Sequence, residues 1–211
     1  MEGMINRTVY TINPNFRLQS NHLLVEWIMI DTFTFQQELL QHESAFIYNK
    51  GKNQIICQRY ENSLHFIYAK IIKWENRLLQ KWLREKLQDY IIDTANRVLP
   101  QRMHELEVQH CLYAKKVIVK KLRKNTLGLC YTGYKTIALS PRIILLPQRY
   151  LDTIILHEMA HLKFPHHRKT FWNFLTILLG EDSKLQNDRM DAMMSTFYNY
   201  SEFLLEFISN N

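Results

Sequence analysis

Two histidines four residues apart with a glutamate beside the first, in the stretch HEMAH that begins at His157, are the residues best suited to chemistry in this sequence. On a helix, residues at this spacing share one face, so the imidazoles of His157 and His161 could bind one metal ion. Neutral imidazoles leave Zn²⁺ enough Lewis acidity to bring the pKa of a bound water toward about 7. Glu158 could then accept the proton of that water, so the pattern predicts a catalytic zinc site with its own general base.

A catalytic zinc site usually has three protein ligands and one open position, so a third ligand must follow or precede the motif. Pro165 ends the helix and lets the chain turn back toward the two histidines. A glutamate on a following helix is an alternative, but Glu181 comes directly after Gly180 at a helix end, a poor place for a rigid ligand. The residues alone leave four candidates for the third ligand: His166, His167, Glu181 and Asp188.

The pattern of apolar residues predicts the elements before the motif. Alternating and β-rich pieces predict strands in the N-terminal part, and a helical period then predicts a long amphipathic helix over residues 68–99. Pro100 is expected to bend or restart this helix before a further helical piece. The other elements predicted in this part are strands in 7–12, 44–49, 54–60 and 63–70, a short helix at 34–41 and a helical piece at 101–109.

After residue 110 the sequence predicts strands first and then helices. A strand at 115–122 is followed by a turn around Thr132 and Gly133 that leads into another strand. The helix that carries the motif begins after Pro147, and the next helix closes at Gly180. The predicted helices are 148–162, 169–180 and 187–208. Helices and strands in this order predict an α+β fold.

Composition indicates a folded protein that carries any metal on histidine. The chain has 211 residues, of which 46% are hydrophobic, and only five glycines and five prolines. The apolar runs are too short to cross a bilayer, and the N-terminus lacks the pattern of a signal peptide, so we expect a soluble cytoplasmic protein with no membrane contact. Cys57, Cys111 and Cys130 form no CxxC pair, which favours reduced, buried thiols over a disulfide framework or a thiolate zinc site.

Six basic residues surround a Val-Ile-Val strand centre, in a chain whose formal net charge is +7. Such a basic stripe could face the phosphates of a nucleic acid or an acidic partner. It could equally keep an exposed strand soluble and blunt a sheet edge, and charge patterns alone favour this second interpretation. The residues of the basic stripe are Lys115, Lys116, Lys120, Lys121, Arg123 and Lys124.

The sequence around the motif resembles the YgjP-like metallopeptidases, compact zincins similar to the SprT-like and Wss1-like proteases. The hallmark of that family is similar to HELxHLKxxNHSxxFW, and HEMAHLKFPHHRKTFW matches it in register through Phe171 and Trp172. Upstream, RVLPQRMHEL and LGLCYTGYKTIALSPRIILLP also resemble the family, so the likeness covers about residues 70–188. The resemblance implies that His167 is the third ligand and that one Zn²⁺ is bound per chain. His166 stands where the family has asparagine.

The resemblance also implies a fold and an activity. The expected fold is a zincin-like core over residues 69–211, in which a small β-sheet packs on the HExxH helix with flanking helices and a C-terminal amphipathic helix. A β-rich region at 1–68, poorly matched to the family, would precede it. The implied activity is hydrolysis of peptide bonds in a protein or peptide substrate by a metal-activated water, with Glu158 as general base.

Departures from the family pattern leave other functions open. Leu127-Gly128-Leu129-Cys130 stands where the family has Trp-Gly-Ser-Cys, and Ser140 replaces an asparagine. The first change could alter the strand beside the substrate cleft. One alternative is a zinc protease associated with nucleic acid through the basic stripe. Another is a binding module that has kept a zincin fold without activity.

Overall fold

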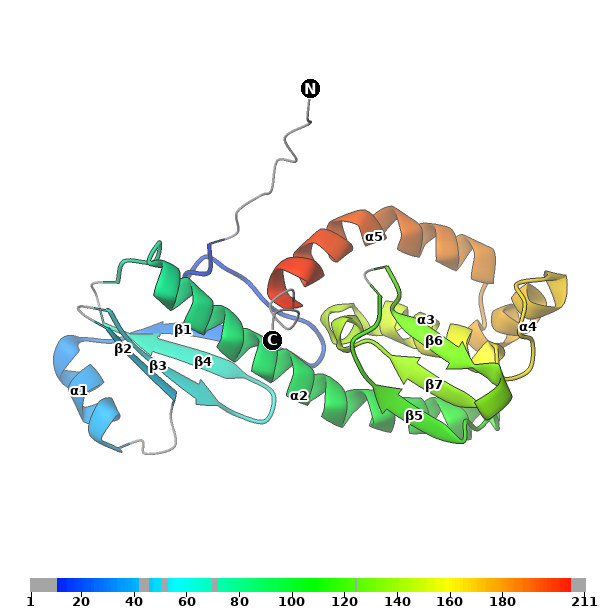
Figure 1. Cartoon of the computed structure of the whole chain (residues 1–211), viewed down its shortest axis with the longest axis horizontal. Coiled ribbons are helices and arrows are strands. Elements are labelled where there is room, and N and C mark those ends of the chain that lie inside the picture. The colour runs from blue at the N-terminus through cyan, green and yellow to red at the C-terminus, as the bar shows by residue number, and fades with distance from the viewer. Residues whose placement is uncertain (1–10, 42–45, 51–52, 70–71, 124, 206–211) are drawn as a thin grey trace, which may run out of the picture. The chain divides into compact units, whose positions relative to one another are not determined.

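The computed structural model describes residues 11–41, 46–50, 53–69, 72–123 and 125–205. Its helices and strands form an α+β protein, which confirms the predicted fold class (Figure 1). Residue contacts divide the chain into two compact units, one comprising Met1–Leu18 with Val25–Leu87 and the other Gln19–Leu24 with Gln88–Asn211. The domain limits expected from the sequence stay predictions.

The first unit is built on a four-stranded sheet in the order β1-β4-β3-β2. β1 runs parallel to β4, and the other neighbours are antiparallel. Helix α1 begins at the carboxylate of Asp31, which accepts hydrogen bonds from the backbone N–H groups of Phe33 and Thr34 at 3.0 Å each. The elements are β1 (Val25–Met29), α1 (Thr32–Gln41), β2 (Phe46–Lys50), β3 (Asn53–Arg59) and β4 (Leu64–Tyr68).

Three of the four predicted N-terminal strands overlap β2, β3 and β4, and the predicted short helix overlaps α1. β1 was not singled out, because its residues lie in an almost continuous apolar run without alternation. Most of the strand predicted at 7–12 lies outside the described residues, and its described end, residues 11 and 12, is not in a strand.

Helix α2 (Arg77–His110) is one continuous helix that passes through Pro100, so the prediction of a restart there was wrong. Leu99 and Met103 on either side of the proline are fully buried, and their packing offsets the hydrogen bond that proline removes. The helix also begins later than predicted. Asn76 caps it, because its side-chain oxygen accepts hydrogen bonds from the N–H groups of Leu78 and Leu79 at 3.0 Å each.

The second unit contains a three-stranded sheet in the order β5-β7-β6, in which β5 is parallel and β6 antiparallel to β7. Helix α3 packs on β6 and β7, α4 packs on α3, and α5 packs on α4 (Figure 1). The elements are β5 (Lys116–Val119), β6 (Gly128–Tyr131), the 3₁₀ turn η1 (Thr132–Tyr134), β7 (Thr136–Leu139), the 3₁₀ turn η2 (Pro141–Leu145), α3 (Gln148–Ala160), α4 (Lys169–Leu179) and α5 (Ser183–Leu205).

The helices of this unit follow the predicted signals closely. α3 begins directly after Pro147, and α4 ends at Gly180, whose φ of 70° is the left-handed conformation that glycine adopts readily. α5 begins four residues before the predicted position, at residue 183 rather than 187, because Asp182 caps it with hydrogen bonds from the N–H groups of Lys184 and Leu185. Among the described residues, no helix is both long and apolar enough to span a membrane.

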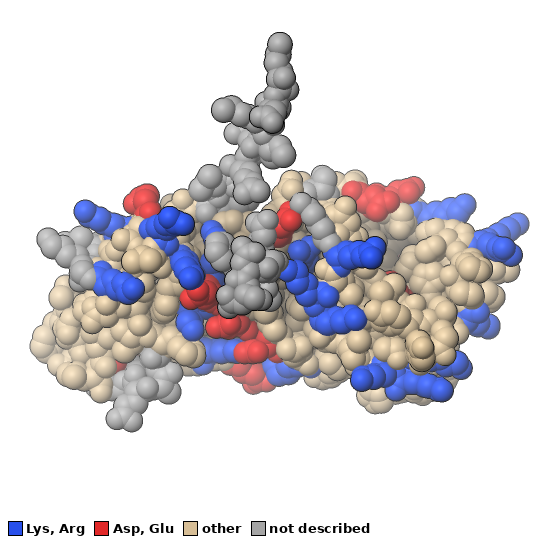
Figure 2. All heavy atoms as spheres, in the orientation of Figure 1, with Lys and Arg blue, Asp and Glu red and all other residues tan. Residues whose placement is uncertain are grey.

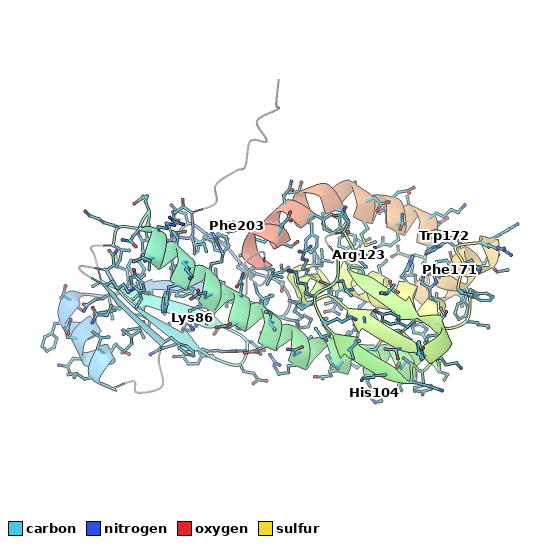
Figure 3. The ribbon with its side chains drawn as sticks, viewed as in Figure 1. Lys86, His104, Arg123, Phe171, Trp172 and Phe203 are labelled. Carbon is cyan, nitrogen blue, oxygen red and sulfur yellow. The ribbon has the colours of Figure 1, made fainter. Side chains whose placement is uncertain are left out.

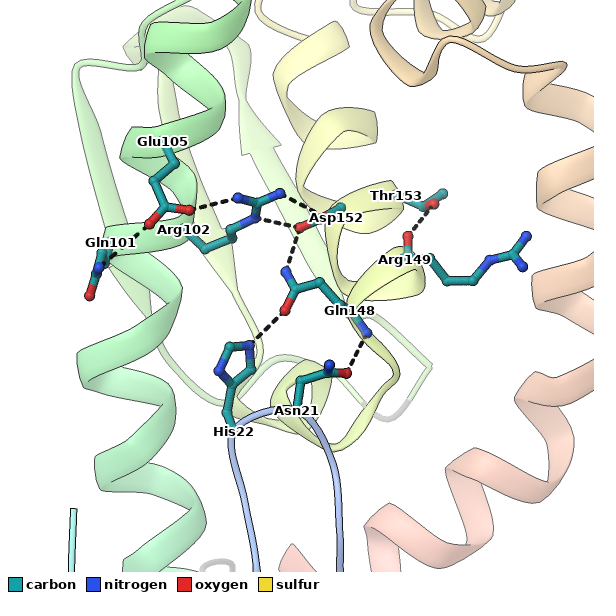
Figure 4. Close-up of polar contacts among 9 residues, drawn as sticks. All are labelled: Asn21, His22, Gln101, Arg102, Glu105, Gln148, Arg149, Asp152 and Thr153. Carbon is teal, nitrogen blue, oxygen red and sulfur yellow. Dashed lines mark hydrogen bonds and ion pairs between the residues drawn. The ribbon is translucent and has the colours of Figure 1, made fainter. Parts of the chain in front are cut away.

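A polar network ties α3 to α2 inside the second unit (Figure 4). The guanidinium of Arg102 on α2 donates from Nε and Nη2 to the two carboxylate oxygens of Asp152 on α3, at 2.7 and 2.9 Å. Gln148 donates to the same carboxylate at 2.8 Å and contacts His22 Nε2 at 2.7 Å. Arg102 also reaches the exposed carboxylate of Glu105. The network fixes the helix that carries the HEMAH motif against its neighbour.

Asp152→Asn should lower the free energy of unfolding by about 1–2 kcal/mol, because an amide cannot form the charged two-point contact with Arg102. Thermal denaturation monitored by circular dichroism would measure the change. Glu105→Gln is the matched control, since its carboxylate is half exposed, and should cost less than about 0.5 kcal/mol. Equal losses in the two variants would contradict the role given to Asp152.

Candidate active site

Three histidine side chains converge where α3 meets the loop that leads into α4. His157 lies in the last turn of α3, His161 is the residue that caps its C-terminus, and His167 comes from the loop. One ring nitrogen from each lies within 4.8 Å of the others, and the Nε2 atoms of His157 and His167 are 2.9 Å apart. Over the described ranges, no other group of three or more His, Cys, Asp or Glu side chains comes together in this way.

Backbone and aromatic contacts orient these rings. The Nδ1 atom of His161 lies 3.1 Å from the carbonyl oxygen of Phe164, which can only accept, so Nδ1 carries the proton and Nε2 is left with its lone pair. Trp172 donates its indole N–H to the carbonyl of His167 at 3.1 Å. Phe171, which Figure 3 labels beside Trp172, is fully buried. Its ring centroid lies 4.6–4.9 Å from those of the three histidines. Phe171 and Trp172 therefore hold the loop that carries His167 in place.

The other candidates for a third ligand lie outside this cluster. His166 is exposed and does not join it, although it is the neighbour of His167 in the sequence. Glu181 forms an ion pair with Arg189 at 3.9 Å, and Asp188 is exposed. Of the four residues that the sequence left open, the structure therefore brings only His167 to the pair on α3.

Glu158 follows His157 but points into the protein, with 7% of its surface exposed. Burial raises its pKa to about 7, and a hydrogen bond from the backbone of Cys130 on β6 lowers it in part. Burial, and then the charge of Glu158, raise the pKa of the Cys130 thiol to about 11. All three cysteines are free thiols, but the prediction that they are buried holds only for Cys57, since Cys111 is exposed and Cys130 is half-buried. The contact of β6 with Glu158 was not predicted, although a glycine within a strand often marks a close approach.

Burial favours the neutral form of two imidazoles of the cluster, those of His157 and His161. Burial lowers the pKa of His157 to about 3, with smaller contributions from the charges of His161 and His167. Burial also lowers the pKa of His161. Protons therefore do not compete with a metal ion for His157 near neutral pH, since a metal ligand must be deprotonated.

These shifts predict how acid affects the metal-free protein. The pKa of His157 is about 3 folded and 6.5 unfolded, so the unfolded chain binds more protons in that window and stability falls as pH falls. Glu158 changes the stability in the opposite direction between pH 4.5 and about 7. Its pKa is higher in the folded chain, which therefore binds more protons, so this contribution to stability rises as pH falls. The two effects offset each other from pH 6.5 to 4.5, and the loss from His157 is unopposed below about pH 4.5.

Melting curves of the chelated protein at several pH values would test this balance. Relative to wild type, Glu158→Gln should lose stability already from pH 6.5 downward, by up to about 1.4 kcal/mol per pH unit, because the opposing carboxylate is gone. Other groups contribute equally to both proteins. Parallel pH profiles for the two proteins would contradict the assigned shifts.

The basic stripe lies at a sheet edge, because β5 is an outer strand of the three-stranded sheet. Lys115, Lys116, Lys120, Lys121 and Arg123 are exposed, and Lys124 lies outside the described residues. Figure 3 labels Arg123 in the segment after β5. On the visible face in Figure 2, lysine and arginine side chains are interspersed with uncharged and acidic ones and do not form one continuous patch. Binding of nucleic acid by this stripe stays a prediction.

Comparison with protein families bears on this site directly. A family model described as "YgjP-like, metallopeptidase domain" matches residues 26–191, which is more than half of the chain. The chain belongs to the YgjP-like metallopeptidase family. The resemblance inferred from HEMAHLKFPHHRKTFW is thereby confirmed. Searches of the curated proteins and of the solved structures found no match.

The YgjP-like match contains the whole three-stranded sheet, α2, α3, α4 and the histidine cluster. It begins within β1, so it also includes most of the N-terminal sheet. A YgjP-like metallopeptidase domain implies hydrolase chemistry with a metal, and the three imidazoles supply nitrogen donors for one.

Proposed function

We propose that this protein is a zinc-dependent metallopeptidase with a zincin-like core. The observation that carries the proposal is the convergence of three imidazoles beside a buried glutamate, in a chain of the YgjP-like metallopeptidase family. The sheet that packs on α3, with α4 against the same helix, supports the zincin-like arrangement expected for residues 69–211.

The donor set fits zinc. His157, His161 and His167 would hold the ion, and three protein ligands with one open position are the usual arrangement in catalytic zinc sites. The hydrogen bond from His161 Nδ1 to the Phe164 carbonyl is the kind of outer contact that orients a zinc-binding histidine. When bound, Zn²⁺ supplies a Lewis acid that polarises the scissile carbonyl and makes water nucleophilic near neutral pH.

Glu158 would carry out the proton transfers of the reaction. As general base it would accept a proton from the attacking water, and as general acid it would return that proton to the leaving amine. A pKa near 7, which burial gives this side chain in the metal-free protein, suits a group that must both accept and donate. Its place next to His157 in the sequence puts it beside the cluster without adding a fourth ligand.

The position of β6 as an outer strand of its sheet, next to Glu158, supports a peptide as the substrate. Ser140 N–H donates to the Leu127 carbonyl at 2.8 Å, so the position just before Gly128 is hydrogen-bonded to the chain that continues β7. The carbonyl of Leu139, the residue paired with Gly128, instead accepts from the N–H of Lys120 at 3.0 Å, on the side of β5. In an antiparallel pair the hydrogen-bonded positions alternate, so the backbone groups of Gly128 and Cys130 face away from β7. The N–H of Cys130 donates to the Glu158 carboxylate, and the carbonyl of Cys130 and the backbone groups of Gly128 lie on this outer side of the strand. An extended peptide can add to such an edge by main-chain hydrogen bonds.

Metal removal tests the proposal. The purified protein should contain about one zinc per chain and should cleave an unfolded protein substrate, since an extended chain fits a strand edge. A chelator should abolish cleavage, and stoichiometric Zn²⁺ should restore it; mass spectrometry of the products and metal analysis would measure both. A fully zinc-loaded protein that cleaves nothing across a broad peptide library would contradict the proposed activity and favour a binding module.

The alternative of a nucleic-acid-associated protease depends on the basic stripe. It predicts DNA binding that weakens steeply with salt and is lost when Lys115, Lys116 and Lys120 are changed to glutamine together. No binding to DNA at low salt would remove this alternative and leave the peptidase proposal unaffected.

A further inference from the structure

Strand β6 lies against Glu158, the residue that the proposed function makes the general base. α3, which carries Glu158, packs on β6, and the two elements are neighbours in Figure 1. The backbone of Cys130 on β6 gives the Glu158 carboxylate a hydrogen bond. β6 therefore contacts the side chain of Glu158 through its backbone.

Gly128, two residues before Cys130 on the same strand, leaves the space that Glu158 occupies. A Cβ atom at Gly128 would lie 2.6 Å from Cγ, 2.7 Å from Oε1 and 2.9 Å from Cδ of Glu158. These separations are far below the roughly 3.5–4.0 Å at which non-bonded carbons pack. Glu158 is buried, so its side chain has little room to step aside without leaving its position.

The backbone conformation of Gly128 does not by itself require glycine. Among the described glycines, Gly180 is the one with a positive φ, and Gly128 lies in a regular antiparallel strand. A glycine inside a strand costs conformational entropy and offers no side chain for packing, so it usually marks a close approach of another group. Here that group is the Glu158 side chain.

We propose that Gly128 is a positioning residue for Glu158: the missing side chain at this point of β6 lets Glu158 lie against the strand and accept the Cys130 hydrogen bond. The catalytic consequence rests on the proposed function, whereas the packing of the two residues does not. Any side chain at position 128 should displace the carboxylate and leave the three histidines in place.

A thermal double-mutant cycle tests the packing without any activity. In the metal-free protein, Gly128→Ala should lower the Tm by about 3 °C or more, because the added methyl overpacks the site. In a Glu158→Ala background the same change should alter the Tm by less than about 1 °C, because the clashing atoms are gone. In a Glu158→Gln background the loss should persist, because glutamine has the shape of glutamate. Gly133→Ala, which meets no atom within 4 Å, is the control in every background.

Kinetics test the positioning role. Gly128→Ala should keep about one zinc per chain and a KM within about twofold of wild type, while kcat falls by about 10-fold or more, since only the proton acceptor moves. Gly133→Ala should behave as wild type.

An equal Tm loss from Gly128→Ala in the wild-type and Glu158→Ala backgrounds would overturn the proposal, because the glycine would then serve the strand alone. So would an unchanged Tm in wild type, or an unchanged kcat in a protein that shows the Tm coupling. If wild type has no peptidase activity, the proposed function fails while the thermal cycle still decides the packing.

Discussion

Glu158→Gln should leave zinc bound and lower the turnover of any accepted peptide by about 10²-fold or more. Glutamine has nearly the shape of glutamate but cannot accept a proton from water. The glutamine side chain should therefore occupy the same buried position against the Cys130 backbone, whereas proton transfer should be lost. Metal analysis and the kcat of the same preparation would separate the two effects.

Glu181→Gln is the matched control for this substitution. Glu181 carries the same functional group on the same unit, but it is exposed and paired with Arg189. It should retain full activity and full zinc. A folded Glu158→Gln protein with zinc bound and undiminished peptidase activity would remove the mechanism proposed for this residue.

Loss of a histidine from the cluster should remove metal and activity together. His157→Ala and His167→Ala each leave two imidazoles, which hold Zn²⁺ poorly, so metal affinity should fall by about 10²-fold or more and cleavage with it. Titration with a competing chelator would measure the affinity of each variant.

His166→Ala is the control for His167→Ala, since the two histidines are adjacent and both exposed, yet only His167 belongs to the cluster. His166→Ala should bind zinc as wild type does. Equal zinc retention by the His166 and His167 variants would show that the third ligand was wrongly chosen.

Local spacing in the sequence determined the part of the candidate site that lies on one helix. The spacing of four positions from His157 to His161 corresponds to about one helical turn, and Pro147 and Pro165 bracket the segment. A helix fixes the direction of its side chains through local backbone geometry alone, so this placement needs no tertiary information. The family could likewise be inferred, because its hallmark is a short contiguous stretch that ends in Phe171 and Trp172.

Helix boundaries were less predictable where two local signals competed. The start of α2 depends on Asn76 as a cap, although the apolar period begins earlier in the chain. Pro100 by itself indicates a break in the helix, yet the packing of the buried residues around it keeps α2 continuous. In both cases packing or a single side-chain hydrogen bond, worth about 1 kcal/mol, decides between alternatives of similar energy.

The remaining parts of the site depend on contacts between segments distant in the sequence, which only the tertiary structure decided. Spacing alone left both His166 and His167 as candidates, and the family resemblance implied His167. The structure brings only His167 to the two histidines of the α3 segment. The sequence around Gly128 indicates only a glycine in a strand, and the close approach of the Glu158 side chain to it appears only in the tertiary structure. Such contacts arise when a sheet packs on a helix, and no local periodicity encodes which atoms will meet there.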